Sequence, residues 1–154
     1  MDARCPFCSP ASSEIFLQNS LSYARWDYYP VGKGHLLIVP FRHLADFFEL
    51  TDDEQNASLE LLRLAKAKLD ADFCPSGYNV GVNVGESAGQ TVMHVHVHLI
   101  PRYQGDVENP EGGVRGVIPD KRVYRLDKQH SGGLCDGKVH SAQCLIHSRC
   151  VCVT

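Results

Sequence analysis

Three histidines alternate with apolar residues in the run His94-Val-His-Val-His-Leu-Ile100. A period of two is typical of a β-strand with one buried face, so this run predicts a strand whose histidines share one side. With a rise of about 3.3 Å per residue, neighbouring histidines stand roughly 6.6 Å apart, while Val95, Val97 and Leu99 enter the core. Three imidazoles on one face can bind a metal, move protons or attack phosphorus. The fold must therefore contain a sheet with one buried face and one face that carries chemistry.

The first hundred residues contain further strands and a helix that can complete such a sheet. Strand-like runs occupy residues 14–17, 21–26, 35–39, 78–84 and 95–100. Thr51 and Glu54 form a capping box, which predicts a long helix that ends before Cys74-Pro75, and a shorter helical turn is expected over 43–50. Strands, then a helix, then strands predict an α+β fold with about five antiparallel strands, one long helix and one short helix.

Length and charge exclude several classes of protein. The chain has 154 residues, which suits one domain with its own core. Its net charge of −3 does not provide the basic surface that holds a nucleic-acid backbone. No apolar run approaches the roughly 20 residues of a membrane span, and the first residues lack the apolar stretch of a signal peptide. We therefore expect a cytoplasmic protein that binds small molecules, with no nucleic-acid or membrane partner.

Composition changes once along the chain, after the last predicted strand. We expect a catalytic domain over 1–103, an extension over 104–126, and a flexible tail over 127–154, where Gly, Ser and Lys are frequent and no apolar period appears. The tail holds four cysteines and three histidines, so a second metal site is the alternative interpretation.

A glycine-flanked segment, residues 83–91, directly precedes the histidines. Gly85 and Gly89 allow sharp turns that present backbone N–H groups to an anion. Side-chain donors in the same segment are Ser87, Gln90 and Thr91. The segment therefore predicts a phosphate site beside a nucleophile.

The His94–Ile100 run matches His-φ-His-φ-His-φ-φ, with φ apolar, and so resembles the signature of the histidine triad (HIT) family. The stretches Gly34–Pro40 and Glu86–His94 also look like segments of its dinucleoside-polyphosphate hydrolase, or fragile histidine triad, branch. The resemblance extends over Leu21 to Arg102. It implies an α+β homodimer that binds a nucleotide and transfers its α-phosphate through a covalent nucleotidyl-histidine.

Carried over residue by residue, the resemblance makes His96 the nucleophile, and His98 and His35 contacts of the phosphate oxygens. It places Asn83, Gly89, Gln90 and Thr91 around the phosphates and the leaving group. Asp27 would accept hydrogen bonds from the ribose hydroxyls. The base would contact apolar side chains, for which the candidates are Leu37, Phe16, Leu21 and Trp26.

The cysteines indicate a metal. Seven is an odd number without the spacing of a disulfide framework, and in a reducing compartment the Cys5-x-x-Cys8 pair indicates metal binding or redox activity. With His43 and His94 this pair makes a Cys₂His₂ set like that of metal-containing HIT proteins, which predicts a structural Zn²⁺. A reducible dithiol or two buried thiols are the alternatives.

The residues leave several functions open. The resemblance predicts hydrolysis of dinucleoside polyphosphates with release of a nucleoside monophosphate, and hydrolysis of nucleoside phosphoramidates would use the same intermediate. Three histidines could instead hold a catalytic metal and its bound water. A nucleotide-binding regulatory module with little turnover is the remaining alternative.

Overall fold

The computed structural model describes residues 5–124, so the predicted tail and its second metal site lie outside the described residues. The strands are β1 (Leu17–Gln18), β2 (Ser22–Trp26), β3 (Leu36–Pro40), β4 (Gly77–Val82) and β5 (Val97–Arg102). One long helix, α1 (Asp52–Phe73), is joined by short 3-10 helices η1 (Ser12–Glu14), η2 (Phe47–Glu49), η3 (Glu86–Ala88), η4 (Gly113–Val117) and η5 (Pro119–Lys121). The predicted α+β fold is confirmed, and the short helix expected over 43–50 is η2.

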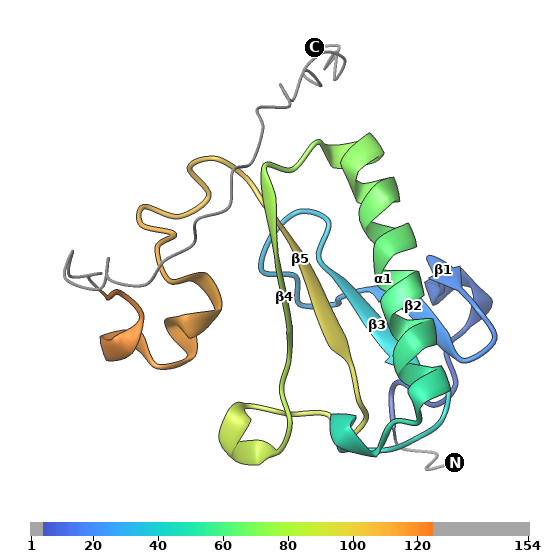
Figure 1. Ribbon diagram of the computed structural model, residues 1–154. Coiled ribbons are helices and arrows are strands. Elements are labelled where there is room, and N and C mark those ends of the chain that lie inside the picture. The colour runs from blue at the N-terminus through green and yellow to red at the C-terminus, as the bar shows by residue number, and fades with distance from the viewer. Residues whose placement is uncertain (1–4, 125–154) are drawn as a thin grey trace, which may run out of the picture.

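The five strands form one antiparallel sheet in the order β1-β2-β3-β5-β4. The chain crosses from β3 through α1 to the edge strand β4 and then returns to place β5 between β3 and β4 (Figure 1). In this register His98 of β5 lies between Leu37 of β3 and Gly81 of β4. The histidine strand is thus held from both sides.

Helix α1 begins and ends where the sequence predicts. The Thr51 hydroxyl accepts a hydrogen bond from the Glu54 N–H, and the Glu54 carboxylate accepts one from the Thr51 N–H at 2.9 Å. The helix ends at Phe73, and the capping residue Cys74, whose φ is 47°, stands just before a proline. No helix among residues 5–124 is long and apolar enough to cross a membrane.

The two faces of the sheet bury different side chains. Helix α1 covers one face (Figure 1), with a core of Leu61, Ala65, Leu69, Ala24, Leu36, Ile38 and Leu99. On the other face Leu37, Tyr23 and Val39 pack against Phe7, and the Tyr23 hydroxyl donates to the Phe7 carbonyl at 2.8 Å. The N-terminal segment therefore covers the β2–β3 part of the face that α1 leaves open.

The strand boundaries differ from the prediction at two places. The first strand was expected over 14–17, but η1 uses Ser12–Glu14 and β1 covers Leu17–Gln18. Strand β5 begins at Val97, so His94 and His96 precede it, because the Val95 N–H bonds to the Leu44 carbonyl at 2.8 Å instead of to a strand. Val95 and Leu99 are buried as predicted, each 1% exposed, whereas Val97 is only partly buried. His94 and His96 are buried too, at 0% and 7% exposed.

Candidate active site and metal centre

His96 is held so that one ring nitrogen is available for chemistry. Its Nδ1–H donates to the His94 carbonyl at 2.7 Å, which leaves the lone pair on Nε2. The ring is 7% exposed and packs edge-on against Phe7, with the centroids 5.3 Å apart. The centroid of the His98 ring lies 5.1 Å from that of His96. A fixed tautomer and a fixed ring plane are what a nucleophilic imidazole needs.

His98, His35 and Asp27 form a chain of polar contacts beside His96. His35 Nε2 lies 3.0 Å from His98 Nδ1, and His35 Nδ1 lies 3.3 Å from an Asp27 carboxylate oxygen. The Val31 N–H donates to His35 Nδ1 at 3.3 Å. An Nδ1 that accepts this bond has no hydrogen to give Asp27, so the Asp27 contact is electrostatic and the His35 hydrogen is placed on Nε2. His35 then donates to His98, and the His98 hydrogen lies on Nε2. His98 can therefore donate to an oxygen atom bound beside His96.

Burial keeps these imidazoles neutral. It lowers the pKa of His98 to about 4, with added repulsion from His96 and His35, against which the Asp27 charge acts. Burial also lowers the pKa of His35, and the Asp27 charge opposes this shift too. At neutral pH both rings are hydrogen-bond donors rather than cations.

The segment before the triad is shaped by two glycines and a buried glutamine. Gly85 and Gly89 have φ values of 82° and 86°, a region that favours glycine. The Gln90 amide oxygen accepts from the Gly85 N–H at 2.7 Å, and its amide nitrogen donates to the Ala45 carbonyl at 2.9 Å. Gln90 is 4% exposed, so its side chain holds the loop in shape, whereas Thr91 is exposed on its surface.

The other predicted substrate contacts occupy two faces of the sheet. Asn83 lines a cavity together with His98, and its side-chain amide reaches the Gly89 carbonyl at 3.5 Å. Leu37 lies on the His98 side but is 4% exposed within a buried cluster. Phe16 and Trp26 contact each other at 4.7 Å on the α1 side.

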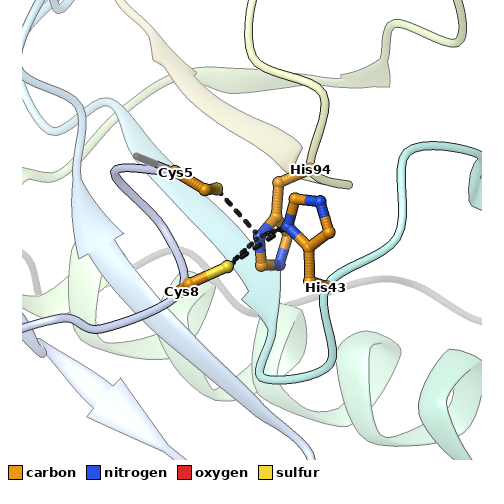
Figure 2. Close-up of side chains that lie close together, drawn as sticks. All are labelled: Cys5, Cys8, His43 and His94. Carbon is orange, nitrogen blue, oxygen red and sulfur yellow. Dashed lines mark hydrogen bonds between the residues drawn. The ribbon is translucent and has the colours of Figure 1, made fainter. Parts of the chain in front are cut away.

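Cys5, Cys8, His43 and His94 converge on one point (Figure 2). The Cys8 sulfur lies 3.2 Å from His43 Nδ1 and 3.7 Å from His94 Nδ1. The Cys5 sulfur lies 3.4 Å from His94 Nδ1, and the two Nδ1 atoms are 3.3 Å apart. All four ligand atoms lie within 4.8 Å of one another. Segments far apart in the sequence thus bring together two sulfurs and two nitrogens.

These distances fit a tetrahedral ion. Zinc bonds of about 2.3 Å to sulfur and about 2.05 Å to nitrogen give tetrahedron edges of roughly 3.6 Å between S and N and roughly 3.3 Å between two N atoms. The His94 Nε2–H donates to the Pro40 carbonyl at 2.8 Å, which turns the Nδ1 lone pair towards the cysteines. Burial lowers the pKa of His94, which favours the neutral form that a metal binds.

Sequence reasoning missed two residues that support the site. Phe7, between the cysteines, contacts the rings of both His94 and His96. Arg25 is 2% exposed, pairs with Glu14 at 3.0 Å and lies 5.6 Å from the Phe7 ring centroid. Two signals in the sequence could have indicated them: Phe7 is an apolar residue inside the Cys-x-x-Cys turn, and Arg25 is a charged residue inside an apolar strand.

The HIT domain family model matches residues 9–105. An AP-4-A phosphorylase of Mycobacterium tuberculosis is 35% identical over 66% of this chain and 52% of that protein. An asymmetrical bis(5'-nucleosyl)-tetraphosphatase of Schizosaccharomyces pombe is 36% identical over 63% and 53%. An adenosine 5'-monophosphoramidase of Saccharomyces cerevisiae is 41% identical over 66% and 65%. The chain spans about half the length of the first two relatives.

Solved structures agree with the fold. A HIT family protein from Bacillus anthracis superposes with a TM-score of 0.62 at 29% identity, over 83% of this chain and 84% of that one. A Zn-bound histidine triad family protein from Mycobacterium smegmatis gives a TM-score of 0.60 at 27% identity, over 69% and 80%.

Proposed function

Because the chain belongs to the HIT domain family, we propose that it is a nucleotide hydrolase acting on the α-phosphate of dinucleoside polyphosphates. The observation that carries this proposal is the anchored His96 ring, whose Nδ1–H donates to the His94 carbonyl and whose Nε2 keeps its lone pair. The names of the mycobacterial and fission-yeast relatives support this substrate class.

In the first step the His96 Nε2 lone pair attacks the α-phosphorus. An N–P bond forms and the bond from phosphorus to the bridging oxygen breaks, so diadenosine tetraphosphate would release ATP and leave an adenylyl group on His96. His98, neutral and with its hydrogen on Nε2, donates to a phosphate oxygen as charge develops. The His94 carbonyl stabilises the cationic imidazole that forms on attack.

In the second step an acceptor takes the adenylyl group. Attack by water breaks the P–N bond and yields AMP, whereas attack by inorganic phosphate would yield ADP. We propose water as the acceptor. Product analysis with and without phosphate separates the two, because ADP formation that depends on phosphate would make the protein a phosphorylase.

The test of the covalent step is His96→Ala. We expect AMP release to fall at least about 1,000-fold while nucleotide binding, measured by calorimetry, changes little, because the lost group acts in the transition state. Wild-type protein mixed with substrate and quenched in alkaline denaturant, which preserves a P–N bond, should carry one adenylyl group by intact-mass measurement. Substantial turnover by the variant would instead favour a metal-bound water as the attacking group.

Asp27 is proposed to select ribose. One carboxylate oxygen accepts from the Tyr29 N–H at 2.9 Å, and a carboxylate has further lone pairs for the two ribose hydroxyls. A 2'-deoxy substrate would leave an acceptor unpaired, at a cost of about 1–3 kcal/mol. We expect adenine and guanine substrates both to be used. Equal use of 2'-deoxy substrates would contradict this role.

Phosphoramidate hydrolysis is the second candidate function. It is supported by the 41% identity to a yeast monophosphoramidase, and it would form the same adenylyl-His96 with ammonia as the leaving group. The two candidate functions can be ranked by measuring hydrolysis rates with diadenosine tri- and tetraphosphate and with adenosine 5'-phosphoramidate. We expect the dinucleotides to be cleaved faster.

Cys5, Cys8, His43 and His94 are proposed to hold a structural Zn²⁺. Four protein ligands leave no position for a substrate, and the ion would tie the N-terminal segment to the residues before β5. A zinc-bound structure of the same fold supports the metal. His96 and His98 stay available for chemistry.

Metal analysis and one matched pair of variants test this site. Purified protein should contain about one zinc per chain, and Cys8→Ser should remove it and lower the melting temperature, because binding energy is folding energy at such a site. Cys74→Ser, at the end of α1, should retain zinc. Wild-type protein without zinc, or with unchanged melting after chelation, would contradict the assignment.

We propose that the protein is a homodimer that uses its β4 edge. Strand β4 is the last in the sheet, and with α1 it borders an apolar groove that includes Leu59 and Val80, which are 58% and 42% exposed. A second copy would cover both the edge and the groove. Light scattering should give twice the monomer mass for the wild type and the monomer mass for Val80→Lys. A monomeric wild type would contradict the proposal.

A further inference from the structure

A cavity of about 370 Å³ adjoins the proposed catalytic residues on the β4 side. His98 and Asn83 lie at one end of it, Gly81 and Ile100 belong to the strands beneath, and η4 borders it with Val114 and Val117. Figure 1 shows η4 (orange) beyond β4, on the side opposite to β3. The volume lies at the lower end of the range typical of small-molecule sites.

Gly81 keeps this space open. It pairs directly with His98 in the sheet, and directly paired residues face the same side. A Cβ atom built at Gly81 would meet nothing within 4 Å. Its backbone does not have a positive φ. No turn or close packing therefore explains the glycine, whereas a ligand beside His98 would need the room.

The wall formed by η4 is braced. Arg115 donates from its guanidinium to the carbonyls of Lys121 and Arg122 at 2.9 and 3.2 Å. At its start, a Cβ on Gly113 would lie 3.3 Å from the Asn79 side-chain nitrogen, so the segment is close to β4. Val114 and Val117 are nevertheless 54% and 74% exposed. Within the single chain these two side chains cover no core.

The order of the strands determines what can reach this cavity. Asp27 follows β2, and His35 precedes β3, so the proposed ribose contact lies on the β3 side of His98. The cavity lies on the β4 side. For a substrate with its α-phosphate at His96 and its first ribose at Asp27, the cavity therefore lies on the side of His98 away from that ribose.

We propose that the cavity bordered by Gly81, Val114 and Val117 binds the nucleoside of the leaving nucleotide and so determines which leaving groups the protein accepts. The inference rests on the proposed function. A planar base is apolar on both faces, which suits the valine side chains, and the glycine leaves room for it beside the strand. The extension is in this view a specificity element.

Two variants and two substrates test the inference. Gly81→Val fills the cavity and Val117→Ser removes an apolar contact; both positions are open, so the fold should persist. For diadenosine tetraphosphate we expect kcat/KM to fall roughly 10-fold or more in each variant, a usual loss when an apolar contact is removed or a pocket blocked. For adenosine 5'-phosphoramidate, which has the same adenylyl half and no leaving nucleoside, the fall should be several times smaller. Ile118→Ser, at an exposed position between η4 and η5, is the matched control and should alter neither rate.

Binding to the His96→Ala background separates this inference from the proposed chemistry. In calorimetry, Gly81→Val should weaken the binding of diadenosine tetraphosphate and leave the binding of AMP unchanged. Equal losses for both ligands, or equal losses of rate for both substrates, would overturn the leaving-group site. If the wild type cleaves neither substrate, the proposed function fails. The cavity is then still tested by binding: an effect of Gly81→Val on diadenosine tetraphosphate alone supports it, and equal effects on both ligands overturn it.

Discussion

Glu54→Gln should destabilise the protein in a manner that depends on pH. The Glu54 carboxylate accepts two hydrogen bonds from the Arg42 guanidinium, both at 2.7 Å, and a third from the Thr51 N–H. The contact joins the first turn of α1 to the residue before His43. This ion pair therefore anchors to α1 the loop that carries His43, a proposed metal ligand.

The size of the effect follows from the pKa of Glu54. Hydrogen bonds from Arg42, the largest cause, lower this pKa from 4.5 to about 2. At about 1.4 kcal/mol per pKa unit the shift corresponds to roughly 3 kcal/mol at neutral pH. The Arg42 side chain is 49% exposed, so solvent screens part of this, and we expect about 2 kcal/mol. For a chain of this length that is a fall of about 4–8 °C in the melting temperature.

Urea denaturation across pH is the assay. The contribution of an ionised Glu54 is complete above its unfolded pKa near 4.5 and is lost as pH falls through the folded value near 2. The gap between wild type and variant should therefore be largest at neutral pH and narrow below about pH 4.5. Asp53→Asn, exposed in the same helical turn, should cost less than about 1 kcal/mol. A gap under about 0.5 kcal/mol, or one that does not change with pH, would refute the reasoning.

Three further changes test other parts of the molecule. Because burial lowers the pKa of His98 to about 4 and also lowers that of His35, acid should destabilise the fold between about pH 6.5 and 4, and a ring-proton NMR titration should find His98 neutral at pH 6. Gly112→Ala puts a Cβ 2.3 Å from the Arg122 carbonyl oxygen at a φ of 83°, so limited proteolysis should cut the extension faster while global melting changes little. Gln90→Leu orphans the backbone groups that this amide satisfies, so stability should fall by about 1–3 kcal/mol; no loss would mean that water replaces the amide.

Local patterns in the sequence predicted the elements well. The capping box at Thr51 and the proline after Cys74 delimit α1 within a residue, because both signals act on the backbone next to them. The alternation around the histidines correctly separated buried Val95 and Leu99 from the site side. It could not show that β5 starts only at Val97, because pairing depends on a partner strand, and residue 95 bonds to a distant loop.

Tertiary contacts account for what the sequence left open. Gln90 looked like a phosphate contact from its place in the glycine segment, but its polar atoms meet Gly85 and Ala45, and the second of these is 45 residues away. Nothing local distinguishes Gly81 from an ordinary strand glycine until its pairing with His98 is known. The connections between strands determine which residues share a site, and the hydrophobic periodicity of the sequence does not indicate how the strands are connected.

His94 joins the proposed metal centre to the proposed nucleophile through a single residue. Its ring is fixed by the Pro40 carbonyl on one nitrogen and faces the cysteines with the other. Its own carbonyl accepts the His96 Nδ1–H and so decides which nitrogen of His96 keeps the lone pair. A displacement of the His94 ring that moved its backbone would therefore disturb the tautomer of His96 without any contact to substrate. Activity and the integrity of the Cys₂His₂ cluster should for this reason be linked, even though the cluster has no open position for a reacting atom.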